Sequence, residues 1–348
     1  MEISRREALR LGGTSTLGVL TAGCTSLGGK SGTDTTDDLE TVPAGVSAVA
    51  HADVATLLDD DAVRRVVDAG LAPLLPWEDG GSDAESQSAL AALSTRTDLD
   101  PANAETAVGF AKYRPDTDRR YVGLRIDSNW SAKSFVDAVE QADFPLTRHT
   151  YRDRPLYESG DAGPSLGVID DGSYAIGTPP AVRAAMDVDA GILDPVDSDL
   201  RRRLAATRSL PFGAAARVPD ELPFGTAGIG GMVDPGQFVA LTSVTGKAYR
   251  DDDGVGAVVR LHAESAADAE DVKATVDGAL AGARSLTADG DTREGLGAVT
   301  VDRSASTVVV EVSGPADVAV TVVEGAAEFL AGVTGVDLTD TTRNAGEP

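Results

Sequence analysis

The amino-acid sequence predicts an α+β protein built from two similar units, each an antiparallel sheet with helices packed on one face. Three observations support this prediction. Short apolar runs are joined by tight-turn sequences such as Asp170-Asp171-Gly172, which is typical of β-hairpins. Other apolar residues recur at helical spacing. The same order of elements occurs twice along the chain, which suggests an internal duplication.

The elements of the first unit can be placed in order from these patterns. The sequence predicts strands near 46–50, 108–113, 121–126, 165–169 and 174–176, and helices through Val63, Val67 and Leu71, through Phe135, Val136 and Val139, and from Pro179 onward. Proline suits the start of that last helix, because the first helical turn does not use its missing amide hydrogen.

The second unit repeats much of this order. The sequence predicts strands near 212–218, 239–249, 258–261, 297–301 and 307–312, and helices through Val272, Val276 and Leu280 and from Pro315 onward. Ser265 and Asp268 resemble a capping box ahead of the first of these helices. On this alignment Arg125 of the first unit falls opposite Arg260 of the second.

Composition limits the range of partners. The 348 residues include 30 Lys and Arg against 56 Asp and Glu, which gives a formal net charge of −26. This balance argues against nucleic acid as a partner, because binding to phosphates depends on clustered basic residues. With 42% hydrophobic and 25% charged residues, the chain nevertheless has the composition of a globular protein.

Residues 1–23 have the features of an export signal. Arg5 and Arg6 precede an uncharged stretch, 11–21, which is far shorter than the roughly 20 apolar residues needed to cross a bilayer. The stretch leads into the sequence Leu20-Thr21-Ala22-Gly23-Cys24, and Cys24 is the single cysteine of the chain. An internal disulfide is therefore excluded.

This segment resembles a twin-arginine signal joined to a lipobox, as in haloarchaeal lipoproteins of unknown function that are exported by the Tat route. The resemblance implies cleavage before Cys24 and a diacylglycerol on its sulfur, whose two acyl chains anchor firmly. It places the protein outside the cytoplasm, on the outer face of the cytoplasmic membrane. Residues 24–41 are expected to form a flexible acidic tether, followed by the units 42–195 and 196–335 and a tail, 336–348.

Catalytic chemistry has one candidate in the sequence. Gly163-Pro164-Ser165-Leu166-Gly167 matches the G-x-S-x-G pattern of α/β-hydrolases, and His262 lies downstream as a candidate base. In those enzymes a helix follows the serine, whereas here the pattern predicts another strand. We therefore assign no catalytic residue, and an extracytoplasmic serine hydrolase using Ser165 and His262 stays as the alternative.

The sequence predicts no metal or cofactor. The three histidines, His51, His149 and His262, lack ligand spacing, and the acidic runs 59–61 and 251–254 lack the pattern of a calcium loop. The glycine-rich stretch 225–231 follows no strand, so it does not match a dinucleotide fingerprint. Asn129-Trp130-Ser131 is a glycosylation sequon.

The expected function is that of a membrane-anchored surface lipoprotein with a non-catalytic binding or structural role. Its expected partners are the membrane, through the lipid on Cys24, and an envelope protein or small ligand whose identity the sequence does not reveal. Asp outnumbers Glu and Arg outnumbers Lys, which is typical of adaptation to concentrated salt. Because molar salt screens the repulsion among these charges, we expect the fold to unfold on dilution into low salt.

Overall fold

A computed structural model describes residues 39–71, 99–112, 121–141, 146–159, 165–207, 210–218, 238–251, 254–286 and 290–320. These residues form an α+β fold rich in antiparallel strands, as predicted. They divide into two compact units: the N-unit holds the described residues of 39–61 and 99–217, and the C-unit holds those of 62–71 and 218–320. Within these ranges, no helix is both long enough and apolar enough to span a bilayer.

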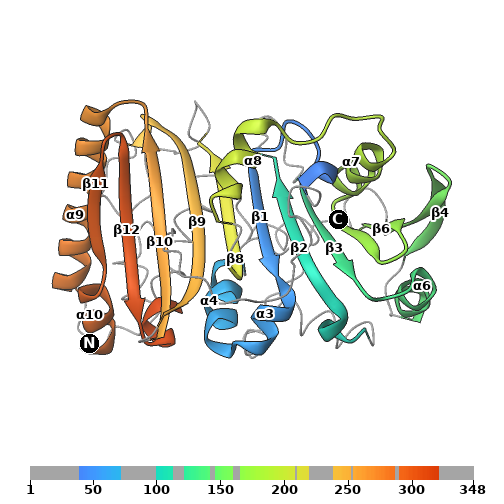
Figure 1. Ribbon diagram of the computed structural model, residues 1–348, viewed down its shortest axis with the longest axis horizontal. Helices are drawn as coiled ribbons and strands as arrows, with labels where there is room; N and C mark the ends of the chain where they lie inside the picture. Colours follow the sequence, from blue (N-terminus) through green and yellow to red (C-terminus); the bar gives the residue numbers. More distant parts are fainter. Residues whose placement is uncertain are drawn as a thin grey trace, which may run out of the picture. The chain divides into compact units, whose positions relative to one another are not determined.

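The sheet of the N-unit is antiparallel throughout. Its strands are β1 (Ala48–Asp53), β2 (Ala104–Ala111), β3 (Val122–Ser128), β4 (Thr147–Tyr151), β5 (Arg154–Glu158), β6 (Ser165–Asp170), β7 (Ser173–Gly177) and β8 (Phe212–Arg217). They lie in the order β8-β1-β2-β3-β7-β6-β5-β4 (Figure 1). The predicted hairpin joins β6 to β7, and Gly172 in its turn has the positive φ of 85° that the tight turn requires.

Short helices connect these strands. They are the 3-10 helices η1 (Leu39–Thr41) and η3 (Pro101–Asn103) and the α-helices α3 (Val54–Asp59), α6 (Ala132–Gln141), α7 (Pro179–Asp189) and α8 (Ser198–Ala205). Pro179 occupies the first turn of α7, as predicted. Ser131 caps α6 by accepting a hydrogen bond from the Ser134 amide at 3.1 Å.

The helices α6 and α7 cover opposite faces of the N-unit sheet. A Cβ atom on Gly167 would lie 2.8 Å from Met186 Sδ of α7, so the side of the sheet that carries Gly167 and its partner Ala175 faces α7. Tyr174, which precedes Ala175 on β7, stacks on Phe135 of α6 with ring centroids 3.8 Å apart. Adjacent strand residues point to opposite faces. The expectation of helices on one face is therefore wrong for this unit.

The core of the N-unit lies on the α7 side of the sheet. Strand residues Val49, Val108 and Ile169 and the helix residues Met186 and Leu200 belong to one buried cluster. Each fully buried aliphatic side chain of this size stabilises the fold by about 1.5–3 kcal/mol relative to an exposed one. The cluster thus fixes β1, β2 and β6 against α7 and α8.

The C-unit has its own antiparallel strands. Its elements are α4 (Asp61–Leu71), β9 (Leu241–Asp251), β10 (Gly254–Ala263), α9 (Ala266–Leu286), α10 (Gly290–Gly297), β11 (Thr300–Ser304) and β12 (Thr307–Gly314), with strand order β11-β12-β10-β9 (Figure 1). The predicted cap is confirmed, because Ser265 Oγ accepts a hydrogen bond from the Asp268 amide at 3.2 Å.

The helix α9 marks the apolar face of the C-unit strands. Arg303 of β11 pairs in register with Val308, so both side chains point to the same side of the sheet. Arg303 forms an ion pair with Glu270 of α9 at 2.7 Å. The helix therefore lies over the face that carries Val308, Val310 and Val312, all of which are buried.

Candidate functional site

The residues predicted for export and lipidation, Arg5, Arg6 and Cys24, lie outside the described residues. The glycine-rich stretch 225–231 lies outside them as well. The lipobox interpretation therefore stays a prediction from sequence. The remaining predicted site residues, Ser165, His262 and Asn129, can each be placed.

Ser165 is the first residue of β6, so the G-x-S-x-G match opens a strand, as its sequence context predicted. Its side chain is fully buried, and its Oγ has no hydrogen-bond partner among the described residues. Ser165 pairs in register with Glu158, whose Oε2 accepts a hydrogen bond from Arg183 Nη2 at 2.6 Å. This serine accordingly has no base bonded to it in the described part of the chain.

His262 lies on β10 and contacts hydroxyl groups on both neighbouring strands. Its Nε2 lies 3.4 Å from Thr245 Oγ1 of β9, and its Nδ1 lies 3.2 Å from Thr307 Oγ1 of β12. A threonine hydroxyl can donate or accept, so either tautomer of the ring is satisfied. Both ring nitrogens therefore take part in cross-strand contacts within the C-unit.

Asn129 lies in the exposed connection between β3 and α6. Its Nδ2, the atom that would carry a glycan, donates a hydrogen bond to Glu105 Oε1 at 2.9 Å. The next residue of the sequon, Trp130, is buried and donates its indole hydrogen to Asp100 O at 3.1 Å. Glycosylation would have to break the Asn129–Glu105 contact, and it stays a prediction.

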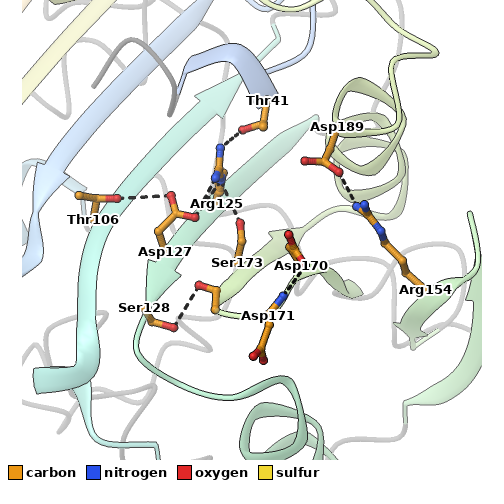
Figure 2. Close-up of polar contacts among 11 residues, drawn as sticks. Thr41, Thr106, Arg125, Asp127, Ser128, Arg154, Asp170, Asp171, Ser173 and Asp189 are labelled. Atoms are coloured by element: carbon orange, nitrogen blue, oxygen red, sulfur yellow. Dashed lines mark hydrogen bonds and ion pairs between the residues drawn. The ribbon is translucent and has the colours of Figure 1, made fainter. Parts of the chain in front are cut away.

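The N-unit contains a polar cluster around Arg125, which the sequence did not single out as a site. Arg125 Nη2 lies 2.8 Å from Asp127 Oδ1, and Arg125 Nε donates to Ser173 Oγ of β7 at 3.1 Å (Figure 2). A further nitrogen of the same guanidinium donates to Thr41 of η1. Thr106 of β2 donates to Asp127 Oδ2 at 3.4 Å. The charge of this arginine is thus neutralised, and its contacts join η1, β3 and β7.

The C-unit carries a second polar arrangement, on the face of its strands opposite Val308. Because residues in register share a face, the pairing places Ser243 beside His262 and Thr245 beside Arg260. We call the following set the polar face: Ser243, Thr245, Lys247 and Tyr249 of β9, Arg260 and His262 of β10, and Thr307, Glu311 and Ser313 of β12.

One end of the polar face is internally bonded. Tyr249 OH donates to Glu311 Oε1 at 3.0 Å, and Lys247 Nζ lies 5.6 Å from the centre of the Tyr249 ring. Burial of the phenol, followed by the hydrogen bond to Glu311, raises the pKa of Tyr249 to about 12. This phenol therefore stays protonated at any physiological pH and acts as a donor to the carboxylate.

The other end of the polar face holds buried polar atoms without partners. Ser243 is 1% exposed, and its Oγ forms no hydrogen bond among the described residues. The buried Nε of Arg260 likewise has no hydrogen-bond partner in the described part of the chain. A buried donor left without a partner costs about 1–3 kcal/mol, so a hydrogen bond from a further group would stabilise this arrangement.

Comparison with known proteins identifies no family for this chain. No protein-family model matches it, and no curated protein matches it. Among solved structures it is similar to crystal forms I and III of a protein named TP0453. The identity is 9% in both cases, with TM-scores of 0.48 and 0.49; the matches cover 83% and 84% of this chain and 96% and 97% of the other. Likeness at this level says nothing of function, which must be argued from the residues themselves.

The side chains at these positions can form hydrogen bonds and ion pairs. In the described ranges, no three His, Cys, Asp or Glu side chains gather as a metal site would require. The polar face instead presents a guanidinium, hydroxyls and an imidazole on three adjacent strands. Such groups recognise hydrogen-bond acceptors, above all anions. The alternation of Val310 and Val312 with Glu311 and Ser313 indicates this face from sequence, although Val309 interrupts the pattern. The sequence does not reveal that Arg260 Nε lacks a partner among the described residues.

Proposed function

We propose that this chain is a lipid-anchored extracytoplasmic protein of a halophile, which binds a ligand or protein partner without catalysing a reaction. The observation that carries the proposal is a pair of buried polar atoms, Arg260 Nε and Ser243 Oγ, which have no hydrogen-bond partner among the described residues. Protein interiors satisfy the great majority of such atoms, so their presence on one strand face favours a site that a bound partner completes.

The contacts of the hydrolase candidates favour binding over catalysis. A serine nucleophile needs a base within hydrogen-bond reach to remove its proton. Ser165 Oγ has no hydrogen-bond partner in the described ranges, while both nitrogens of His262 contact threonine hydroxyls. A general base would have to give up at least one of those contacts.

Lipid anchoring rests on the sequence of residues 1–24. Its test is the Cys24→Ser variant expressed in a haloarchaeal host, with the membrane fraction separated and the lipid label measured. We expect the variant to lose the label and to leave the membrane fraction. Retention of both would contradict the anchoring.

The binding role is tested against catalysis with an ester substrate. The purified full chain should not hydrolyse p-nitrophenyl acetate faster than its Ser165→Ala and His262→Ala variants. Turnover that both substitutions abolish would replace the proposed function with that of a serine hydrolase.

The proposal includes an internal duplication of the two units, which three matched features support. The strand order β2-β3-β7-β6 of the N-unit has the same form as β9-β10-β12-β11 of the C-unit. In each unit an aromatic ring covers a glycine of the next strand: a Cβ atom added to Gly123 would lie 2.2 Å from the Phe110 ring, and one added to Gly256 would lie 2.2 Å from the Tyr249 ring. A capping serine then starts the following helix in both units.

A further inference from the structure

Arg260 differs from a typical buried arginine because no carboxylate of the described chain neutralises it. Its buried Nε has no partner in the described ranges, although the chain carries 56 acidic residues against 30 basic ones. Acidic side chains are therefore plentiful in this sequence, yet none of the described ones pairs with this position. The arginine residue as a whole is only partly buried, so part of it is open to solvent although its Nε is not.

Resting on the proposed binding function, we infer that Arg260 anchors a site for the carboxylate group of a small organic acid. A guanidinium presents its donors in a planar fork that matches the two oxygens of a carboxylate. Ser243 lies diagonally across from Arg260 on the adjacent strand, where the Cα separation is roughly 7–8 Å. Its buried hydroxyl, which has no hydrogen-bond partner among the described residues, is a second donor on the same side of the sheet.

The surroundings of Arg260 favour a singly charged acid with an apolar part. Val309 stands directly opposite Arg260 on β12 and is partly exposed, so it can contact a short alkyl chain. Glu311 lies two residues further along the same strand face. Its negative charge penalises a multiply charged anion such as phosphate more than a carboxylate, because repulsion from a neighbouring charge grows with the charge of the anion.

Calorimetric titration of the full chain in molar KCl provides the test. Butyrate, acetate and inorganic phosphate are the three probes. We expect butyrate to bind more tightly than acetate, and phosphate to bind most weakly. The Arg260→Gln variant should weaken butyrate binding by about tenfold or more, and Ser243→Ala by about fivefold, as expected for hydrogen bonds to a charged and to a neutral donor.

Arg303→Gln is the matched control, because it removes one positive charge from the same unit on the opposite face of the sheet. Arg303 is already paired with Glu270, and its loss should leave the dissociation constant for butyrate within about twofold. Circular dichroism of every variant in the same salt checks that the fold is retained. Arg260→Lys gives a second variant, in which the charge remains but the planar fork is lost, and we expect intermediate affinity.

Butyrate binding that Arg260→Gln leaves unchanged would overturn the inference, as would tighter binding of phosphate than of butyrate. The failure of the proposed function has a different signature. If none of the probes binds, but mass spectrometry finds a compound without a carboxylate group on protein extracted from its own membrane, and the Arg260→Gln variant lacks it, the carboxylate class is wrong and the binding role stands. Ester turnover that depends on Ser165 would overturn the binding role itself, whatever Arg260 does.

Discussion

Arg125 and Arg260 lie on strands of the two units and differ in their contacts. Arg125 is bonded to other side chains of the fold, whereas Arg260 is the arginine proposed to bind a ligand. Arg125 has an ion pair with Asp127 and hydrogen bonds to Ser173 and Thr41. Arg260 has Thr245 and Val309 as its in-register neighbours, and it forms no ion pair with a described carboxylate. Both residues are arginines, but only the charge of Arg125 is neutralised by a carboxylate of the described chain.

The difference depends on a single position two residues downstream. Side chains two apart on a strand share a face. In the N-unit that position is Asp127, which supplies a negative charge. In the C-unit it is His262, whose ring bonds to threonine hydroxyls and supplies no carboxylate. A short local sequence therefore decides whether the arginine stabilises the fold or is left for a ligand.

The largest loss of stability is expected from breaking the ion pair between Arg125 and Asp127. In Arg125→Gln, the Asp127 carboxylate, 22% exposed, loses its cation. Leaving a mostly buried charge alone should lower the free energy of unfolding by about 3 kcal/mol. Urea denaturation in molar salt measures this. The double variant Arg125→Gln/Asp127→Asn should recover most of the loss, and its failure to do so would contradict the ion-pair explanation.

A smaller loss of stability, of similar size in both units, is expected at the two glycines that lie under aromatic rings. Gly123→Ala and Gly256→Ala each place a methyl group 2.2 Å from an aromatic ring, which must shift. Overpacking of this kind should cost about 2 kcal/mol in each unit, again measured by denaturation. Gly282→Ala is the control, since a Cβ there meets nothing within 4 Å. Strongly unequal losses would count against the duplication.

The next effect concerns another neutralised arginine, Arg217, whose partner Asp197 also caps α8. Burial raises the pKa of Asp197, but the Leu200 amide and Arg217 more than offset this, so the pKa is lowered. Asp197→Ala should cost about 1 kcal/mol through the lost cap. Because the folded pKa is below the unfolded one, this contribution is present above about pH 4 and is lost as the pH falls further.

The comparison between Asp197→Ala and Asp197→Asn separates the cap from the charge. Asparagine still caps a helix, so its variant should lose less stability and should also lose the acid dependence at this position. Denaturation at several pH values measures both. Equal losses in the two variants would show that the ion pair with Arg217, not the cap, is the important contact.

The smallest effect on stability is expected at Arg260, which has no ion pair among the described residues. Arg260→Gln should lower the free energy of unfolding by no more than about 0.5 kcal/mol, because no described ion pair is lost and a buried donor without a described partner is removed. His262→Asp should convert this position to the Arg125 type, with butyrate binding abolished by an internal carboxylate. If His262→Asp binds butyrate as well as the original chain, the contrast between the two arginines has another cause.

Local signals predicted a large part of the fold. The β6–β7 hairpin follows from Asp171-Gly172, the start of α7 from Pro179 and the cap of α9 from Ser265. The β4–β5 hairpin was missed, because its turn residues Arg152 and Asp153 adopt positive φ without the usual glycine or asparagine.

The placement of helices and the candidate site needed the tertiary structure. All five residues of β7 are buried, so no alternation revealed that helices cover both faces of the sheet. The sequence aligned Arg125 with Arg260. When the units are matched through Gly123 and Gly256, the residue corresponding to Arg125 is Val258. The cross-strand register shows that Thr245 and Val309 flank Arg260, with Glu311 two residues further along the same face. Only the side-chain contacts show that no described carboxylate forms an ion pair with it.

The buried aromatic cluster of the N-unit gives the protein an optical reporter. Trp130 is 5% exposed, its ring centre lies 6.5 Å from that of Phe135, and it is one of only two tryptophans in the chain. In a Trp77→Phe variant, the emission wavelength of Trp130 would follow the unfolding of the N-unit alone. The salt requirement of the half that contains Arg125 could then be measured separately from that of the half that contains Arg260.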